Sequence, residues 1–570
     1  MFFSVALLCA SVPLWWIFRY FSPAADRMDR RDFLASTLAV SAASLAGCTN
    51  PSMPPLPPGE LYGASLDIVH RLREPNFPQP SETRRVPVAI VGAGIGGLAA
   101  GWKLAKAGFG DFLMVELEAE AGGNSRAGRN EVTAYPWAAH YLPLPTREAT
   151  SVRELLAELG VLQGDPHAAQ PRYDERYLCS TPQERLYRNG MWQEGVLPLA
   201  GVSAAEREQY RRFHALMDDL KRRKDGQGRR AFALPMALSS RAPDLLALDK
   251  LSMRDWLLGQ GLDSPHLHWY VDYSCRDDYG TGLAEVSAWA GIHYFASRNG
   301  EAQDASSDTV LTAPEGNAWL AHGMAQSITT RVGDRLLKNA LVFRVANTGK
   351  QVEIDLWLPA ENRTLRLLAN QLIWAAPLFL LPHVFAGHDA LKVAARSVSH
   401  APWLVANLTL SRFPEDRTGA PPAWDNVLYS GPGLGYVVAT HQQMRVRPAA
   451  TVFTYYRALN EMTPRQGRAQ LRDTPREVWA EKILAELERP HPDIRAVTTR
   501  LDVFRNGHAM ARPLPGFLSG AARQRFAADS ERIRFAHADV SGFSLFEEAQ
   551  YRGVLAAERT LRRLGHKRPA

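Results

Sequence analysis

The chain has 570 residues, of which 46% are hydrophobic and 22% are charged, and its formal net charge is +7. This length predicts two intertwined domains rather than one, and the composition is that of a globular protein with ample material for a core. Acidic and basic residues are interspersed without a long Lys/Arg run, so the charge pattern argues against nucleic-acid binding.

The first 48 residues predict a targeting region. An apolar run over residues 2–21 predicts either a transmembrane helix or a stretch upstream of a true start at Met28. The second is favoured, because a start at Met28 leaves a compact positive segment at the N-terminus. Arg30-Arg31-Asp32-Phe33-Leu34 then precedes a weakly apolar, Ala/Ser-rich run that ends in Leu45-Ala46-Gly47-Cys48.

The order of these segments resembles a bacterial twin-arginine (Tat) signal that ends in a lipobox. The resemblance implies export of the folded protein by the Tat translocase, cleavage before Cys48 and a diacylglycerol on its sulfur. We therefore expect a protein lipid-anchored on the periplasmic side of a bacterial membrane. Residues 49–83 are expected to form a linker and lead-in that begins as an extended spacer, because it contains Pro51, Pro54, Pro55, Pro57 and Pro58.

A dinucleotide-binding motif follows this linker. Residues 86–91 predict a buried strand, and the next six residues carry Gly92, Gly94 and Gly97 in the pattern G-x-G-x-x-G. The first glycine permits a tight turn, the second permits close approach of a pyrophosphate, and the third lets a helix pack on the strand. A helix, a second strand over 112–115 and then Glu116 complete the pattern, with the acid placed to bind ribose hydroxyls.

The segment after Glu116 contains Gly122, Gly123, Asn124 and Arg126. Together with the glycine motif it resembles the flavin-containing amine oxidase superfamily, which includes phytoene desaturases and protoporphyrinogen oxidase. The resemblance implies FAD as the cofactor. Arg is usual where this chain has Asn124, and Arg126 is expected to take over its phosphate contact.

Later blocks extend this resemblance over most of the chain after residue 84. By the match, Val342 lies on the adenine side of the cofactor, Ala376 follows a strand that crosses it, and Asp539 meets the ribityl-phosphate region. Ala549 precedes a helix expected over 554–564, whose N-terminus faces the phosphate and the flavin ring. The expected fold is α/β, with a Rossmann-type FAD-binding domain of the glutathione-reductase kind interleaved with an α+β substrate domain. The FAD-binding domain is expected over 84–150, 310–395 and 515–570, and the substrate domain over 151–309 and 396–514.

One segment of the substrate domain mixes charged and aromatic residues beside an apolar helix, and it includes Arg276, Asp277, Asp278 and Tyr279. It predicts either a pocket wall, where acids bind a cationic amine and aromatic rings surround it, or a buried ion-pair network between helices. Both interpretations remain open, because charged groups in apolar surroundings need partners in either case.

Three further residues are candidates for catalysis by their position in the resemblance. His140 and Tyr141 lie in a loop that passes close to the flavin in the family, and His508 lies where the family builds the roof of its pocket. A structural role is at least as well supported for each histidine. No metal site is expected, and Cys179 and Cys275 are either free buried thiols or one disulfide.

The expected activity is hydride transfer from an amine, or from a C–C or C–N bond of a small molecule, to flavin N5. The alternatives are a dehydrogenase like phytoene desaturase or protoporphyrinogen oxidase, and a non-catalytic FAD-binding lipoprotein. Many amine oxidases carry a Lys near flavin N5, and by resemblance its place falls at Val310, with no Lys between Lys250 and Lys338. We therefore expect slow reaction with oxygen and transfer of electrons to a quinone or protein acceptor.

Overall fold

The computed structural model describes residues 55–443, 449–528 and 530–566. The chain divides into two units, Met1–Pro55 and Leu56–Ala570, and the second contains every element discussed below. The expected targeting features, from Met28 and the arginine pair to Cys48, lie outside the described residues. Within the described ranges, no helix is both long enough and apolar enough to cross a membrane.

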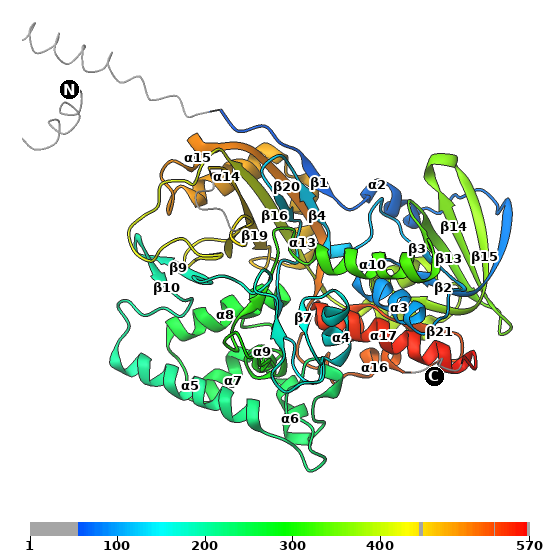
Figure 1. The fold of residues 1–570 in the computed structure, drawn as a ribbon, viewed down its shortest axis with the longest axis horizontal. Helices are drawn as coiled ribbons and strands as arrows, with labels where there is room; N and C mark the ends of the chain where they lie inside the picture. The colour runs from blue at the N-terminus through cyan, green and yellow to red at the C-terminus, as the bar shows by residue number, and fades with distance from the viewer. Residues whose placement is uncertain (1–54, 444–448, 529, 567–570) are drawn as a thin grey trace, which may run out of the picture. The chain divides into compact units, whose positions relative to one another are not determined.

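A seven-stranded sheet forms the first layer of the fold (Figure 1). The four strands β12, β3, β2 and β15, which run from one edge of the sheet to its middle, are parallel. β21 continues beside the end of β15 where β14 no longer pairs with it. β3 is buried at all four residues, as expected for a parallel strand covered on both faces. In sheet order the strands are β12 (Leu336–Leu337), β3 (Phe112–Val115), β2 (Glu82–Val91), β15 (Arg363–Trp374), β14 (Val352–Leu358) and β13 (Leu341–Asn347), with β21 (Ile533–Phe535) against β15.

Three helices pack on this sheet: α3 (Ile95–Lys106), α10 (Ala318–Val332) and α17 (Phe546–Arg563). α3 contacts both of the others, so segments far apart in the sequence lie side by side (Figure 1). The contact between α3 and α17 is close because it is made at glycines: a Cβ on Gly553 would lie 2.1 Å from the carbonyl oxygen of Gly96.

An eight-stranded sheet forms the second layer. Its central strand β16 is buried along its whole length, between the long strand β20 and β19. Helix α14 (Arg476–Leu487) packs on it through Trp479, which has no exposed surface. In order the strands are β1 (Leu61–Gly63), β20 (Thr498–Ala511), β16 (His400–Leu410), β19 (Thr451–Ala458), β18 (Gly435–Val438), β17 (Asp425–Leu428), β9 (Glu184–Arg188) and β10 (Met191–Glu194).

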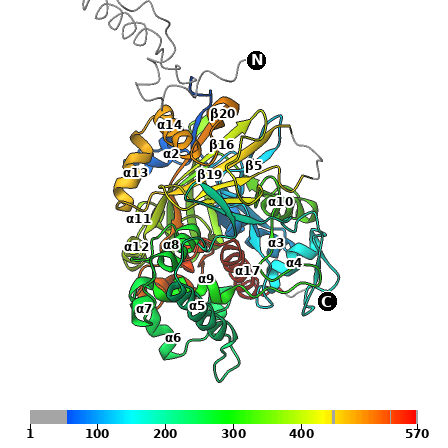
Figure 2. The same ribbon diagram turned by 90° about the vertical axis from the view of Figure 1, so that its left-hand side faces the viewer.

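A group of helices with its own apolar core adjoins the second sheet (Figure 2). Ser203 caps the longest of them, α5, through a capping box with Glu206, which satisfies backbone donors at its start. The group contains α5 (Ala204–Arg222), α6 (Pro243–Ala247), α7 (Met253–Gly259), α8 (Pro265–Tyr279) and α9 (Ala288–Ser297).

Smaller elements connect these layers. The helices among them are α2 (Leu66–Val69), α4 (Thr150–Glu158), α11 (Leu381–Val384), α12 (Asp389–Arg396), α13 (Pro464–Asp473), α15 (Ile494–Val497) and α16 (Ala521–Ala527). The short strands form three pairs: β4 (Ala127–Arg129) with β5 (Ala134–Pro136), β6 (Leu142–Pro143) with β11 (Val310–Leu311), and β7 (Leu162–Gln163) with β8 (Arg172–Tyr173).

The expected α/β fold with a Rossmann-type domain is confirmed. The lead-in to the first domain differs from a simple linker, because Leu61–Gly63 forms an edge strand of the second sheet and Leu501 donates a backbone hydrogen bond to the carbonyl of Pro58 at 2.8 Å. The unpaired edge of β20 explains this docking, since each exposed backbone group there needs a partner. Both Cys179 and Cys275 are buried free thiols.

Candidate functional site

The glycine motif forms the turn between β2 and α3. Gly92 has φ +97°, and a Cβ there would lie 2.9 Å from the backbone of Ala375 and Ala376, so only glycine suits this turn. A Cβ on Gly97 would lie 1.8 Å from the carbonyl oxygen of Gly92, which explains the close packing of the helix on the strand. Both expected roles therefore have a direct steric cause.

Gly94 differs from its neighbours because it faces open space. A Cβ added to it would meet only the Cα of Gly123, at 3.9 Å, and Gly123 in turn faces only the Cα of Gly94. Gly122 donates a hydrogen bond to the carbonyl of Ala93 at 2.8 Å and holds the two glycine segments together. No side chain caps the start of α3. We call Gly94, Gly122, Gly123 and the first turn of α3 the glycine cradle; its free amides suit a diphosphate.

Glu116 directly follows β3 and supports the cradle. Its carboxylate accepts backbone hydrogen bonds from Ala93 at 2.7 Å and Glu118 at 2.9 Å, while burial raises its pKa. Arg126 lies beside the same segment, with its guanidinium 3.5 Å from the Glu118 carboxylate and its Nε 3.1 Å from the Gly123 carbonyl. The arrangement places one acid and one guanidinium next to the cradle.

Asn124 links the two domains. Its amide donates to the carbonyl of Ala509 at 2.7 Å and accepts from the amide of Asn506 at 2.8 Å, and Ala509 and Asn506 lie in β20. Both ends of the Asn124 side chain are therefore engaged with the second sheet. Arg126, which carries the charge that a phosphate requires, remains beside the cradle.

Val342, Ala376 and Ala549, which are also expected to bind the cofactor, lie around the cradle. The carbonyl of Glu116 accepts from Ala340, which brings the start of β13 and Val342 beside it, and Ala376 adjoins Gly92. The Ala549 carbonyl would lie 3.5 Å from a Cβ on Gly96.

Asp539 is fully enclosed and already has partners. Its carboxylate accepts from the amide of Leu378 at 2.9 Å and lies 3.0 Å from His400 Nε2 and 3.2 Å from His537 Nδ1. The two histidines hold the pKa of Asp539 well below its ordinary value, although burial opposes them. The carboxylate therefore ties β16 of the second sheet to the end of β21, in addition to any contact with a cofactor.

A second group of functional side chains surrounds Tyr141. The Tyr141 hydroxyl lies 3.3 Å from both Asp277 and Asp278, and Arg298 donates to Asp278 at 2.7 Å. Burial, reinforced by the charges of Asp278 and Asp425, raises the pKa of Asp277 to about 8. Asp277 has no basic partner as close as the one that Arg298 provides for Asp278.

Asp425, at the start of β17, extends this group. It accepts hydrogen bonds from the hydroxyls of Tyr456 at 2.7 Å and Tyr273 at 3.4 Å, and burial raises its pKa to about 6. The ring of His140 lies 5.2 Å from that of Tyr456 and 5.6 Å from that of Trp424. We call the whole set the acid–aromatic cluster: His140, Tyr141, Tyr273, Asp277, Asp278, Arg298, Trp424, Asp425 and Tyr456.

The structure separates the predicted site residues into two groups. Asp277, Asp278, His140 and Tyr141 belong to the cluster, whereas Arg276 pairs with Asp272 at 2.8 Å and the Tyr279 hydroxyl donates to Ala290 at 3.0 Å. His508 stacks on Phe379 at 4.0 Å, outside the cluster. Burial lowers the pKa of His140 to about 4 and that of His508 to about 3, so both are neutral near pH 7.

The cluster contains residues that the sequence did not single out, chiefly Arg298, Asp425 and Tyr456. Each lies in an unremarkable local pattern and joins the cluster only through tertiary contacts. Glu547, in the first turn of α17, lies near the same group and is 2% exposed. Burial raises its pKa to about 7, and Arg298 and Asp278 act on its charge.

The loop over residues 137–141 connects the cluster to the cradle. Ala139 donates to the carbonyl of Asn124 at 3.1 Å, next to Gly123, and Asn317 donates to the carbonyl of Ala139 at 3.0 Å. Two residues further on, His140 and Tyr141 enter the cluster. α17 makes a second connection, since Glu547 lies near Arg298 while Ala549 adjoins Gly96.

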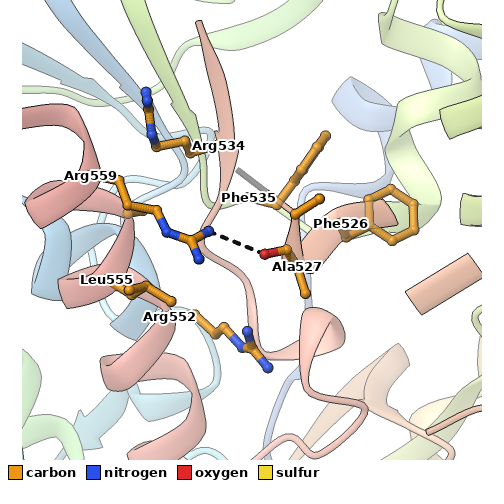
Figure 3. Close-up of a pocket in the computed structure, with 9 residues that line it drawn as sticks. Phe526, Ala527, Arg534, Phe535, Arg552, Leu555 and Arg559 are labelled. Carbon is orange, nitrogen blue, oxygen red and sulfur yellow. Dashed lines mark hydrogen bonds between the residues drawn. The ribbon is translucent and has the colours of Figure 1, made fainter. Parts of the chain in front are cut away.

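A small cavity in Figure 3 illustrates a structural use of arginine outside this site. It has a volume of about 10 Å³ and lies between α16, β21 and α17. Arg559 donates to the carbonyl of Ala527 at 3.1 Å across it. The space suffices for about one water molecule, so it is no site for an organic ligand.

Comparison with known proteins supports the fold and the cradle. A family described as an NAD(P)-binding Rossmann-like domain matches residues 90–159. No curated protein matches the chain. A solved double mutant of putrescine oxidase superposes with a TM-score of 0.62 at 18% identity, over 84% of this chain and 100% of that one.

Two further solved structures extend the comparison. Cyclohexylamine oxidase from Brevibacterium oxydans superposes with a TM-score of 0.60 at 14% identity, over 84% of this chain and 99% of that one. A fatty acid isomerase from P. acnes that produces CLA gives 0.58 at 14% identity, over 83% and 98%. At these identities the likeness shows a shared two-domain fold, and because that fold serves several activities, function must be argued from the site.

Proposed function

We propose that this protein is an FAD-dependent oxidoreductase of the amine oxidase type, which removes a hydride from carbon next to nitrogen in a small-molecule substrate. The observation that carries the proposal is the direct connection between the glycine cradle and the buried acid–aromatic cluster. A dinucleotide site beside an enclosed cluster of acids and rings suits the oxidation of an amine, whose protonated form the acids attract before the neutral form reacts. The two oxidases with the same fold act on amines by their names.

The residues of the chain divide the work between binding and enclosure. Amides at the start of α3 bind the diphosphate, with room for it at Gly94 and Gly123, because an uncapped helix N-terminus carries partial positive charge. Glu116 lies where a carboxylate reaches ribose hydroxyls. Rings of the acid–aromatic cluster exclude water and orient the substrate, and bound FAD supplies the acceptor for the hydride.

The acids of the cluster favour an amine over a purely apolar polyene. An ammonium would stabilise the ionised forms of Asp277 and Asp425, which burial disfavours, whereas an apolar substrate would make no polar contact with either acid. A desaturase-like activity therefore fits this interior less well. A non-catalytic flavoprotein would have no use for acids held at this cost.

Purified protein tests the proposal. We expect bound FAD in about equal amount to protein, and bleaching of its absorbance when amines are added under anaerobic conditions. Polyenes serve as the comparison set. Protein that carries flavin but is bleached by no amine would contradict the enzymatic role, and protein without flavin would contradict the cofactor.

We also propose that the Tat signal and the lipid anchor at Cys48 deliver the folded, FAD-loaded protein to the periplasmic face of a membrane. Export in the folded state explains how a cofactor made in the cytosol reaches that compartment. There the enzyme would pass electrons to a quinone or a protein acceptor. Val310, at the position expected for the Lys of oxidases, lies in β11 and packs against the apolar core that includes Trp424 and Tyr456. Its apolar side chain does not supply the positive charge that would favour reaction with oxygen.

A further inference from the structure

A cavity apart from the cradle and the acid–aromatic cluster lies where the helical group meets the C-terminal part of the chain. It has a volume of about 50 Å³ and is bordered by α6, α9 and the segment that leads into α16. Charged and polar side chains contribute much of its wall. We call it the Arg523 cavity, and its lining includes Arg241, Leu246, Asp249, Trp289, Ser519 and Arg523.

Arg523 is held in place at this cavity with one donor unused. Its Nε donates to the carbonyl of Leu518 at 2.6 Å, and its Nη1 donates to the carbonyl of Val540 at 3.2 Å. Among the described residues, Nη2 has no hydrogen-bond partner and no carboxylate lies within ion-pair distance of the guanidinium. A positioned guanidinium with an open donor suits an acceptor that does not belong to the protein.

Arg241 and Trp289 supply further donors without acceptors. Arg241 is exposed, and its side chain makes neither a hydrogen bond nor an ion pair within the described part of the chain. Trp289 is only 3% exposed, yet its buried Nε1 has no partner in the same ranges. A buried indole N–H usually finds an acceptor. Donors from three separate segments therefore lack acceptors around one cavity.

The charges around the cavity favour an anion. Burial, followed by the charges of Arg552 and Arg241, lowers the pKa of Arg523 to about 10, although Glu548 and Asp249 act in the opposite direction. Three guanidinium groups thus repel one another beside two acids. An anion in the cavity would relieve that repulsion.

Asp249 lines the same cavity but does not make it a site for a cation. One of its carboxylate oxygens accepts from the hydroxyl of Ser287 at 2.8 Å. The other accepts from the backbone amide of Ser519 at 2.8 Å and from its hydroxyl at 2.7 Å. Both oxygens are therefore already used to hold the segment before α16.

We propose that the Arg523 cavity binds a phosphate group, which accepts hydrogen bonds from Arg523, Arg241 and the indole of Trp289. One water molecule needs about 10–15 Å³, so the cavity has room for roughly four oxygen-sized atoms. A phosphate presents four oxygens and suits the donors of a guanidinium, whereas a chloride ion would fill only part of the space. Bound there, the phosphate would link the helical group to α16. The proposal does not depend on the oxidation of an amine.

Two sources offer such a group: free inorganic phosphate and the headgroup of an anionic phospholipid. Leu246 lines the cavity and is 36% exposed, and Leu238 is 37% exposed between two residues that also line it. Apolar surface therefore lies next to the cavity, where the chain of a lipid would need it. The experiment has one arm for each source.

The first arm is equilibrium dialysis of the holoprotein against radiolabelled inorganic phosphate, with chloride holding the ionic strength constant. Bound FAD fills the glycine cradle, so the cradle does not act as a second phosphate site. We expect about one phosphate per chain, and a loss of at least about 10-fold in affinity with Arg523→Gln or Arg241→Gln, since each removes charge-assisted hydrogen bonds. Arg525→Gln, at an exposed position of α16, makes the same change in charge and should keep the affinity.

The second arm measures flotation with phosphatidylglycerol vesicles, using a form that starts at Met28 and carries Cys48→Ala so that no anchor contributes. Flavin content and melting temperature check that each variant folds, and the exposed Arg241 keeps the test valid if Arg523→Gln does not fold. Binding in either arm that is lost with the cavity variants and kept with Arg525→Gln supports the site and identifies its source. Binding in neither arm, or binding that all three variants change equally, would overturn the proposal.

Discussion

Substitution of Gly94 separates cofactor binding from folding. A side chain at this position would meet only the Cα of Gly123, at 3.9 Å, and the backbone is extended, with φ −68° and ψ −175°. Gly94→Val should therefore change the free energy of unfolding of the apoprotein by less than about 1 kcal/mol, and the loss of a glycine offsets part of any cost. The same side chain would occupy the space that a diphosphate needs.

The expected loss of affinity follows from the hydrogen bonds that the diphosphate would make. Each charge-assisted bond from a backbone amide contributes about 1.5–3 kcal/mol, so losing two costs about 3–6 kcal/mol. That corresponds to a factor of roughly 10² to 10⁴ in affinity. Gly97→Ala is the contrasting change, since its Cβ would lie 1.8 Å from a carbonyl oxygen and should destabilise the fold itself.

The assay measures flavin per protein after purification, the dissociation constant of FAD for the apoprotein by fluorescence titration, and the melting temperature. We expect Gly94→Val to melt like wild-type apoprotein and to contain no flavin, whereas Gly97→Ala should melt earlier. Wild-type flavin content in Gly94→Val protein would refute the assignment of the cradle. An equal loss of stability in both variants would refute the steric reasoning.

Three further predictions concern pH, targeting and oxygen. Asp277, with its pKa raised to about 8, stays protonated in the folded protein, whereas its carboxyl group is ionised in the unfolded chain. The free energy of unfolding of the apoprotein should therefore fall as pH rises from about 6.5 to 8, by at most about 1.4 kcal/mol per pH unit for this group. Below about pH 6.5 the trend should flatten, because folded His140, with a pKa of about 4, resists a proton that unfolded histidine accepts, and its contribution cancels that of Asp277. Melting scans in which Asp277→Asn keeps the full slope above pH 6.5 would contradict this account. Arg30→Lys with Arg31→Lys should leave FAD-loaded protein in the cytoplasm. Cys48→Ala, in a form starting at Met28, should release the exported protein from membranes. Membrane retention of the Cys48→Ala protein would count against the lipid anchor. Reduced flavin should react with oxygen more slowly than turnover and faster with a soluble quinone in stopped-flow experiments; reoxidation by oxygen as fast as turnover would return the protein to the oxidase class despite Val310.

The sequence alone was sufficient for the dinucleotide motif and for much of the secondary structure. The strand, glycines, helix and acid from Val86 to Glu116 are contiguous in the chain. The steric reason for Gly97 is local, at the Gly92 carbonyl, whereas that for Gly92 lies at Ala375 and Ala376. The strands predicted over 86–91 and 112–115 correspond to β2 and β3. Local steric rules and hydrophobic periodicity act over a few residues, so a sequence displays them directly.

The cluster beside the cradle was decided by tertiary structure. The sequence indicated Asp277 and Asp278 as part of either a pocket wall or an ion-pair network. In the structure Arg298 pairs with Asp278, whereas Asp277, among the described residues, is hydrogen-bonded by Tyr141 and forms no ion pair. Asp425, in strand β17, accepts from Tyr273 of α8 and acts on Asp277, and Asn124 and Asp539 take partners on distant strands. Such contacts join residues more than a hundred positions apart, and no periodicity along the chain encodes them. They form only when the two sheets and the helical group pack together and bring each buried charged group close to its partner.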